Sequence, residues 1–365
     1  MNPKHPHIAV VFNEPVTSTE EGRKFISEKG QLSAFASRLE VMKNTSSNIV
    51  DLSEIGVIEE REQVEKALES KGYQTSLFNI DGDIKRLITF IEQHRPDLIF
   101  NLCESLKGQA IHEMHVAGIY ELMNVPYTGT GTLALGTCLN KIRTKEILSF
   151  HRIPTARYKM FQSAQEVNLD DLHLRFPLIV KPSREDASIG IENSSVVRDI
   201  KSLHQRIADV VNIYNQPALV EEYIEGRELN IAIIGNGQPI ALPISEIDFS
   251  NLPSEYPKIV TYNAKWVEGT AEYTGTVGTC PAKLPEYVEQ RIREIALEAY
   301  QIMEIRDYAR VDIRLNNQDE PFVLEVNPNP DISRDSGFAR SARTANMSFE
   351  EMIARIVETA LERTR

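Results

Sequence analysis

The chain of 365 residues has little of what several classes of protein require. It contains no run of about 18 apolar residues, so we expect no membrane-spanning helix. The short apolar stretch near its start is soon followed by Glu14 and Pro15, which argues against a signal peptide. The cysteines are only Cys103, Cys138 and Cys280, and they form no C-x-x-C pair. Scattered cysteines of this kind favour reduced thiols and a cytoplasmic protein.

Positive charge is also scarce. The 40 lysines and arginines are outnumbered by 53 acidic residues, which gives a formal net charge of -13. This balance argues against non-specific binding to nucleic acid or to anionic membranes, since both favour basic patches. The net charge does not exclude binding of a nucleotide, because that needs only a few local lysines. The hydrophobic content of 41% is ordinary for a globular protein, and the length predicts two or three subdomains.

Several catalytic and binding motifs are missing as well. The sequence has no G-x-S-x-G elbow, and "HEMH" at 112–115 lacks the histidine spacing of H-E-x-x-H zinc sites. "YTGTGTLALG" at 127–136 is not followed at the right distance by the acidic residue of a dinucleotide site, so we expect a tight turn there. These absences argue against a serine hydrolase with a nucleophile elbow, a zinc protease and an enzyme that binds a dinucleotide cofactor.

The N-terminal third alternates strand-like and helix-like segments. Strands are predicted at 7–14, 74–80 and 96–104, with helices at 58–73 and 84–95 between them. This order is typical of a parallel sheet with helices on its faces. Residues 15–57 are polar and serine-rich, and we interpret them as an insertion after the first strand.

Two strand-like segments near the C-terminus carry the most informative pattern. "YARVDIRL" (308–315) and "PFVLEVNPNPD" (321–331) are joined by a short polar turn, which predicts an antiparallel hairpin. Because side chains alternate along a strand, each strand should have one apolar and one polar face. On the first strand, Val311, Ile313 and Leu315 should form the apolar face, and Arg310, Asp312 and Arg314 the polar face. On the second strand, Phe322, Leu324 and Val326 should share one face, and Val323, Glu325 and Asn327 the other.

The polar face of this hairpin would bring Asp312, Glu325 and Asn327 together. Two carboxylates and an amide oxygen suit Mg²⁺, which leaves its other positions for water and phosphate. The alternative is an exposed polar sheet face. Lys181 ends a predicted strand and Lys141 begins a predicted helix, so both could reach a phosphate; the alternative for each is an ordinary surface lysine.

"LVEEYIEGRE" (219–228) runs from an apolar strand into a turn. Its backbone could bond an adenine, and a carboxylate could accept the hydroxyls of a ribose. An acidic strand–turn–strand without a ligand is the alternative.

Taken together, these segments resemble the ATP-grasp superfamily and, within it, the D-alanine–D-alanine ligase branch. The matching pieces keep the family's order over most of residues 97–361: "VPYTGTGTLALGTCLNKIRTKEIL", "FPLIVKPSREDASIG", "LVEEYIEGREL", "YNAKW", "YARVDIRL", "FVLEVNPNPD" and "SFEEMIARI". The resemblance implies an α/β protein with a parallel-sheet N-terminal domain (1–139). It implies two α+β subdomains (140–226 and 227–365) that hold ATP between them.

The resemblance also implies roles for individual residues. The implied ATP contacts are Lys141, Lys181 and Ser188 at the phosphates, Glu221, Glu222 and the backbone near Ile224 at the adenine edge, and Glu228 at the ribose. Asp312, Glu325 and Asn327 would hold two Mg²⁺ ions, for which Mn²⁺ can substitute. Arg310 would stabilise the negative oxygens of an acyl phosphate and of the tetrahedral intermediate. Lys265 would close over the γ-phosphate, and Ser336 would bind the carboxylate of the amine-donating amino acid.

The implied activity is an ATP-dependent, ADP-forming ligase that joins a carboxylate to an amine through an acyl phosphate. The implied partners are a small carboxylate, an amino acid and a second copy of the chain in a homodimer, with no nucleic acid or membrane. An authentic D-alanine–D-alanine ligase is one alternative. A nucleotide-binding regulatory protein that has lost turnover is another.

The sequence departs from the family where the first substrate binds. A glutamate, a serine and a tyrosine form a network there in the family, and the matching positions are Ser53, Ala187 and Trp266. Asp331 replaces the glycine of the family's N-x-x-P-G turn. Because these changes gather around the first substrate, we expect the chemistry to be kept and the carboxylate substrate to differ from D-alanine. Another amino acid or a specialised metabolite, such as a mycosporine, would fit.

Overall fold

A computed structural model describes residues 6–14 and 56–363 of the chain. Contacts divide the chain into two compact units, Met1–Thr128 with Ile353–Arg365, and Gly129–Met352. The predicted insertion at 15–57 lies outside the described residues except for its last two positions, which begin a helix, and Ser53 lies outside them too. The subdomain boundaries at 139 and 226 stay a prediction.

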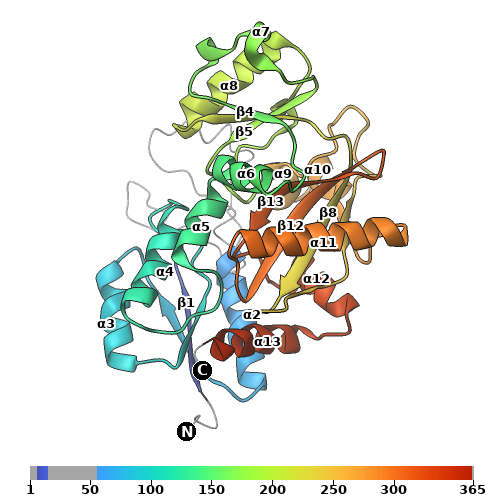
Figure 1. Cartoon of the computed structure of the whole chain (residues 1–365). Helices are drawn as coiled ribbons and strands as arrows, with labels where there is room; N and C mark the ends of the chain where they lie inside the picture. The colour runs from blue at the N-terminus through green and yellow to red at the C-terminus, as the bar shows by residue number, and fades with distance from the viewer. Residues whose placement is uncertain (1–5, 15–55, 364–365) are drawn as a thin grey trace. The chain divides into compact units, whose positions relative to one another are not determined.

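The first unit contains the parallel sheet that the sequence predicts. Its strand order is β2-β1-β3, and β1 pairs in parallel with both neighbours (Figure 1). Residues Ile8 to Val11 of the central strand are fully buried, as expected where helices cover both faces of a parallel sheet. The elements of this unit are β1 (His7–Phe12), α2 (Gly56–Ser70), β2 (Gln74–Asn79), α3 (Ile84–His94), β3 (Leu98–Asn101) and α4 (His112–Leu122).

The second unit contains two sheets, of which the smaller has four strands in the order β4-β7-β5-β6. Helix α8 packs on this sheet and buries Leu203, Ile207 and Val210 against Val180 and Val220. The elements of this part are α5 (Thr132–Leu139), α6 (Lys141–Phe150), β4 (Tyr158–Phe161), η2 (Ala164–Glu166), α7 (Leu169–Leu172), β5 (Leu178–Pro182), η3 (Asn193–Ser195), β6 (Val196–Val197), α8 (Ile200–Tyr214) and β7 (Ala218–Glu222).

The larger sheet has the order β11-β10-β8-β12-β13, with β9 paired to β8. Its elements and the helices around them are β8 (Gly226–Ile234), β9 (Ile240–Ala241), β10 (Ser245–Asp248), α9 (Tyr262–Trp266), α10 (Ala271–Gly275), β11 (Val277–Thr279), α11 (Glu286–Ile302), β12 (Tyr308–Asn316), β13 (Pro321–Asn327) and α12 (Gly337–Thr344). The last helix, α13 (Phe349–Glu362), belongs to the first unit from Ile353 onward. A capping box precedes α13: Ser348 and Glu351 each accept a hydrogen bond from the other's backbone N–H.

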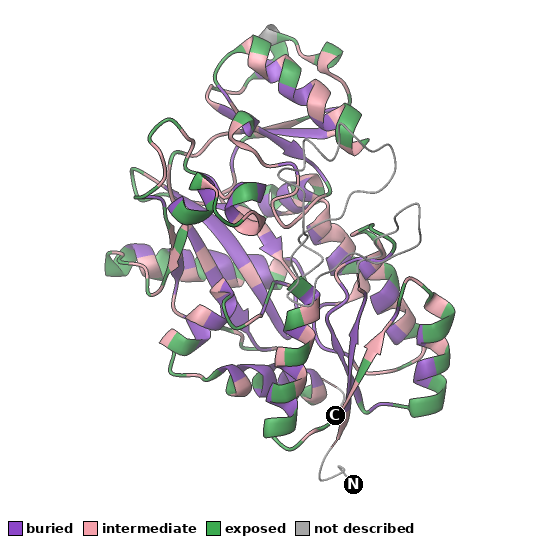
Figure 2. Ribbon diagram, turned by 180° about the vertical axis from the view of Figure 1, so that it is seen from behind, coloured by how far each residue is buried: buried purple, intermediate pink, exposed green. Residues whose placement is uncertain are grey.

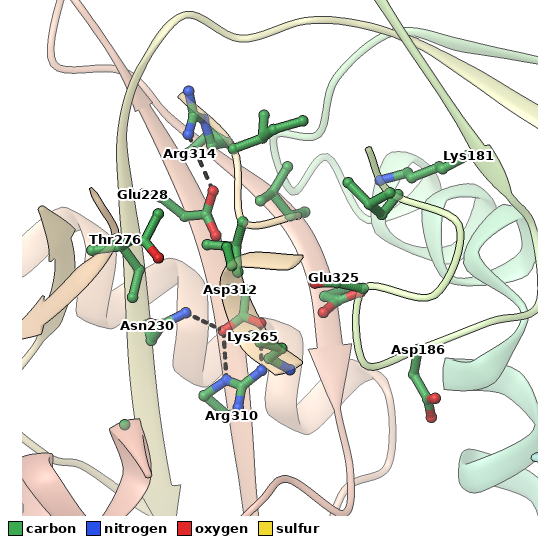
Figure 3. Close-up of a pocket in the computed structure, with 18 of the residues that line it drawn as sticks. Lys181, Asp186, Glu228, Asn230, Lys265, Thr276, Arg310, Asp312, Arg314 and Glu325 are labelled. Atoms are coloured by element: carbon green, nitrogen blue, oxygen red, sulfur yellow. Dashed lines mark hydrogen bonds and ion pairs between the residues drawn. The ribbon is translucent and has the colours of Figure 1, made fainter. Parts of the chain in front are cut away.

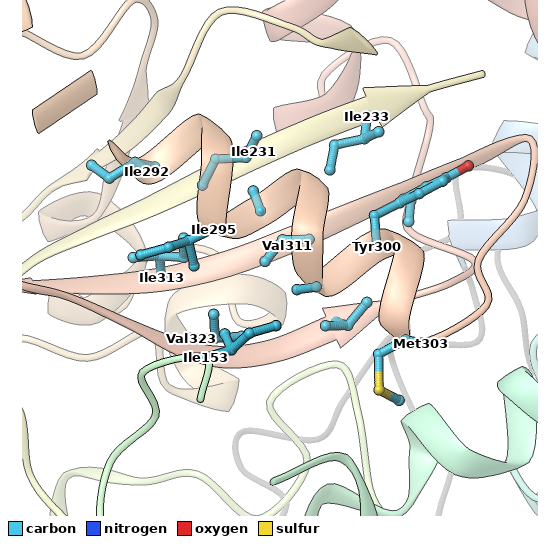
Figure 4. Packing of buried hydrophobic residues seen from close by; sticks show 14 of the residues in the cluster. Ile153, Ile231, Ile233, Ile292, Ile295, Tyr300, Met303, Val311, Ile313 and Val323 are labelled. Atoms are coloured by element: carbon cyan, nitrogen blue, oxygen red, sulfur yellow. The ribbon is translucent and has the colours of Figure 1, made fainter. Parts of the chain in front are cut away.

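Helix α11 covers one face of the larger sheet. Ile292 and Ile295 of this helix are fully buried against Ile231 and Val311 of the strands (Figure 4). In Figure 2, buried residues follow the strands of this sheet while exposed ones lie on the outer side of the helices. Because one face carries this apolar core, the polar side chains of the strands lie on the other face.

The predicted hairpin is confirmed, but strict alternation on its second strand is wrong. β12 and β13 pair antiparallel, with Asp312 opposite Glu325 and Ile313 opposite Val323, so the register shifts by one residue at Leu324. A β-bulge of this kind places two residues of one strand opposite one residue of its partner. Val323 therefore packs in the core, whereas Leu324 lines a cavity beside Glu325.

In the described part of the chain, no helix is both long and apolar enough to cross a membrane.

The packing of α11 gives a stability prediction. Ile292→Ala should destabilise the protein by about 2–5 kcal/mol, because it leaves a cavity where the side chain is fully buried. The matched control is Ile240→Ala, the same chemical change at a side chain that is 52% exposed, which should cost about 0.5 kcal/mol or less. Urea unfolding followed by the emission of Trp266, the one tryptophan of the chain, measures both. Equal midpoints for the two variants would contradict the packing.

Candidate active site

A row of polar side chains crosses the larger sheet on the face opposite α11. Glu325 pairs with Asp312, Asp312 with Asn230, and Asn230 with Ser245 on successive strands. Residues directly opposite each other on neighbouring strands share a face of the sheet. Glu325, Asp312 and Asn230 line a cavity of about 600 Å³ (Figure 3). This volume is that of a small-molecule binding site.

Asp312 is the most heavily bonded residue of this row. Arg310 holds it in a bidentate pair, with Nε and one Nη each 2.8 Å from a carboxylate oxygen. Asn230 donates to the same carboxylate at 2.7 Å, and Asn327 donates at 3.0 Å to Asp312 and at 3.1 Å to Glu325. The predicted convergence of these side chains is therefore confirmed. Burial alone lowers the pKa of Arg310, but Asp312 and Glu325 together raise it above its usual value.

Two lysines enter the same cavity from other elements. Lys141, at the start of α6, lies 2.9 Å from Glu325, and Lys181, near the end of β5, lies 2.6 Å from Glu221. Although burial alone raises the pKa of Glu325, Lys141 and Lys181 hold it well below its usual range. Burial and the charge of Lys141 lower the pKa of Lys181 to about 8.

Glu221 is shared between two lysines. Its carboxylate is 1% exposed, and its other oxygen lies 2.5 Å from Lys145, which is equally buried. Lys145 also donates to the hydroxyl of Thr155 at 2.6 Å. One buried carboxylate thus contacts the amino groups of two lysines, one from α6 and one from β5. Burial and the charge of Lys181 lower the pKa of Lys145 well below its usual value.

A second arginine closes the far side of the cavity. Arg314 lies 3.2 Å from Glu228 and donates to the backbone carbonyls of Ile224 at 2.9 Å and of Lys258 at 2.9 Å. Burial raises the pKa of Glu228 in spite of this arginine. The carboxylate of Glu222 accepts from the backbone N–H of Arg175 at 3.0 Å, and lies beside the guanidinium of that residue.

The donor set suits a nucleotide with a divalent metal. Asp312, Glu325 and Asn327 offer hard oxygens on adjacent strands, and Lys141 and Lys181 offer cations to phosphate. Among the described residues, no three histidine, cysteine, aspartate or glutamate side chains gather as a metal site. Two carboxylates and one amide would leave most positions of a Mg²⁺ ion to phosphate and water, as is common for nucleotide enzymes.

Ala187 and Trp266, the two described positions of the altered network, are in direct contact. The indole Nε1–H of Trp266 donates to the backbone carbonyl of Ala187 at 2.9 Å. Ala187 and its neighbour Ser188 both have left-handed backbones, with φ of 48° and 60°. Such a conformation is uncommon outside glycine. Here it occurs where the carbonyl of Ala187 faces Trp266, the last residue of α9. A side-chain-to-backbone bond therefore joins the two segments in which the family has a side-chain network and the sequence predicts its loss.

The cavity gathers most of the predicted site residues. Those that line it are Lys141, Lys181, Ser188, Glu221, Glu222, Ile224, Glu228, Lys265, Arg310, Asp312, Glu325, Asp331 and Ser336. Asn327 is not a lining residue but bonds two that are. Ala187 and Trp266 lie behind Ser188 and Lys265, their neighbours in the chain.

Four residues around the cavity were not predicted as part of the site, and each follows a simple spacing. Lys145 and Arg340 come four residues after Lys141 and Ser336 on helices, so each lies on the same helical face as its predecessor. Asn230 and Arg314 come two residues after Glu228 and Asp312 on strands. Because side chains alternate along a strand, residues two positions apart lie on the same face of the sheet. Periodicity applied to the predicted residues would have found all four.

Comparisons with known proteins agree with this geometry. The family described as D-ala D-ala ligase C-terminus matches residues 147–358. An uncharacterized protein, y4sG, of Sinorhizobium fredii is 34% identical over 310 residues, which cover 83% of this chain and 87% of that protein. The D-alanine–D-alanine ligase of Desulforudis audaxviator is 31% identical over 299 residues, with 81% of this chain and 91% of that enzyme covered.

Solved structures share the fold. The crystal structure of the D-alanine–D-alanine ligase of Bacillus anthracis complexed with ATP superposes with a TM-score of 0.70 over 98% of both chains, at 22% sequence identity. The family match and the relatives above 30% identity agree with this likeness. The chain therefore belongs to the D-alanine–D-alanine ligase family of ATP-grasp enzymes, which are ATP-dependent ligases that form C–N bonds.

Proposed function

We propose that this enzyme joins an amino acid, through its amine, to a carboxylate substrate other than D-alanine. The observation that carries the proposal is the bond between Trp266 and the backbone of Ala187. Alanine has no hydroxyl for a side-chain network, and the indole uses its only donor on the carbonyl. The loops near the first substrate are thus held together without the groups that the family resemblance assigns to D-alanine.

The proposed reaction has two steps. An oxygen of the carboxylate substrate attacks the γ-phosphorus of ATP, a P–O bond forms, and the bond to the β-phosphate breaks to release ADP. The amine nitrogen then attacks the acyl carbon, so that a C–N bond forms, inorganic phosphate leaves and the nitrogen loses a proton. Phosphate is a far better leaving group than hydroxide, which is why the first step is needed.

The residues of the cavity suit these steps. Lys141 and Lys181 would bind phosphate oxygens, and Asp312, Glu325 and Asn327 would hold a divalent metal. This metal would supply positive charge to the transferring phosphoryl group. Arg310, which pairs with Asp312, would stabilise the oxyanion that forms when the amine attacks. Lys265, on the short helix α9, covers the phosphate and the incoming amine, which excludes water from the acyl phosphate.

An authentic D-alanine–D-alanine ligase is the second candidate. Relatives that carry this name are 31% identical over about nine-tenths of their own length. A homodimer and a cytoplasmic location are further proposals that rest on the family resemblance alone.

Phosphate release separates the two candidates. The wild-type enzyme with ATP and Mg²⁺ should release phosphate above background only when both an amino acid and a suitable carboxylate are present. D-Alanine alone, which can serve as both substrates, should give no release above background. Release with D-alanine alone at the rate of the best pair would overturn the first candidate in favour of the second. No release with any pair of carboxylate and amine would contradict both.

The same assay tests the metal positions. Asp312→Asn and Glu325→Gln should each lower turnover more than about a hundredfold, because each removes a negative ligand from the metal. Far-ultraviolet circular dichroism should stay that of the wild type. The matched control is Asp319→Asn, the same change at an exposed turn residue, which should keep its activity. Activity like the wild type in either site variant would contradict the assignment.

The lowered pKa of Lys181 predicts a pH effect on nucleotide binding. With a pKa of about 8 in the free enzyme, Lys181 loses its charge as the pH rises through 8. Phosphate binds the charged form, so ATP affinity should fall above pH 8 and binding there should take up about one proton. Calorimetry in buffers of different ionisation enthalpy measures this uptake. Lys181→Arg, which stays charged, should take up none, and equal uptake in both proteins would contradict the assignment.

The contact of Trp266 with Ala187 gives a prediction on dynamics. Trp266→Phe keeps an aromatic ring but removes the N–H, at a cost of about 1 kcal/mol. Backbone amides at Ile189 and Ile191, which bond within the loop that carries Ala187, should then exchange with deuterium about fivefold faster. Amides of β12 serve as the internal control and should not change. Unchanged exchange in the loop would show that the bond does not hold it.

A further inference from the structure

The cations that line the cavity fall into two groups. Lys141, Lys181, Arg310 and Arg314 are each within 3.2 Å of an acidic side chain. Lys265 and Arg340 form no ion pair with any described residue. The family resemblance gives Lys265 a role at the γ-phosphate, but it assigns nothing to Arg340.

Arg340 is nevertheless held in one place. It lies one turn after Ser336 on α12, and its guanidinium donates to the hydroxyl of Ser245 at 3.1 Å and to the backbone carbonyl of Asp335 at 3.4 Å. The guanidinium lies flat against Gly278 of β11, where a Cβ atom would come within 2.1 Å of it. Any residue other than glycine at this position would displace the guanidinium. The wall of the cavity is thus shaped around this side chain.

The charge of Arg340 has no ion-pair partner among the described residues. Both hydrogen-bond acceptors are neutral, the carboxylate of Asp335 acts on the guanidinium only through space, and only two of its five N–H groups are used. The side chain is also partly removed from water, and a cation in such a place gains most from an anion that can bind two of its N–H groups. A carboxylate matches this requirement in charge and in geometry.

The location of Arg340 separates this charge from the metal site. Ser245 is two strands away from Asp312 in the row across the sheet, which corresponds to about 10 Å. An anion bound to Arg340 therefore belongs to neither the triphosphate nor the reacting carboxyl group. Ser336, the position implied for the α-carboxylate of the amine donor, lies on the same helix one turn earlier. The anion on Arg340 is accordingly a further group of the amine-donating substrate.

We propose that Arg340, supported by Ser245 and Gly278, forms a subsite for a second carboxylate on the amine-donating amino acid. The preferred amine donor is then an acidic amino acid, whose side chain extends from the reacting nitrogen toward β10 and β11. This inference rests on the proposed function for the identity of the amine site. Its own evidence is the guanidinium of Arg340, which is held in place and forms no ion pair with any described residue.

Equilibrium binding tests the subsite without turnover. Calorimetry on the enzyme with a non-hydrolysable ATP analogue and Mg²⁺ would compare both enantiomers of glutamate and aspartate with those of glutamine and asparagine. The best acidic ligand should bind at least about tenfold more tightly than its amide, the value of one charge-assisted pair. In Arg340→Met the acid and its amide should bind equally, whereas Arg340→Lys should restore part of the preference.

Arg343→Met is the matched control. Arg343 lies on the same helix but is exposed and does not line the cavity, so its variant should keep the preference for the acid. Equal affinity of acid and amide in the wild type, no binding of either, or a preference that survives in Arg340→Met would each overturn the subsite. Tight, Arg340-dependent binding of the acid without phosphate release would instead count against the ligase reaction and leave the subsite standing.

Discussion

The bidentate pair between Arg310 and Asp312 is the contact on which the rest of the site depends. Both residues lie on β12, the strand between β8 and β13, so every other group of the site is placed relative to them. Asp312 also accepts from Asn230 on one side and Asn327 on the other. An arginine that is 13% exposed is tolerated here because a carboxylate holds it in two hydrogen bonds. The apolar core under α11 holds β12 in position, and β12 in turn positions Arg310 and Asp312.

The larger sheet therefore has two faces with different tasks. One face is the apolar core that determines stability, and the other carries a row of ionic and amide groups from β13 to β10. The bulge at Leu324 allows β13 to contribute to both faces, since Val323 stays in the core while Glu325 lies opposite Asp312. The groups that we propose for substrate specificity, by contrast, lie on the loops, on α12 and on the edge strands β10 and β11.

Periodicity predicted the parallel sheet, the hairpin and the meeting of Asp312 with Glu325, because those features follow from the repeat of a strand and from short turns. The bulge could not be predicted, since an extra residue in a strand leaves no mark in the hydrophobic pattern. Lys145 was missed because a single lysine is typical of a protein surface. Its spacing from Lys141 indicates the helical face, and its burial against Glu221 shows its contact. The contact between Trp266 and Ala187 uses a backbone carbonyl, which no side-chain pattern can indicate.

The carboxylate of Glu221, held by Lys145 and Lys181, has a consequence for how a nucleotide arrives. Lys141 and Lys181 already pair with carboxylates of the protein, so a phosphate that binds them replaces Glu325 and Glu221 as their partners. Binding then resembles an exchange of ions inside the cavity more than an attraction from solution. For a chain with a net charge of -13, long-range attraction of an anionic nucleotide is not available in any case. Recognition is left to short-range contacts, which respond little to the salt concentration.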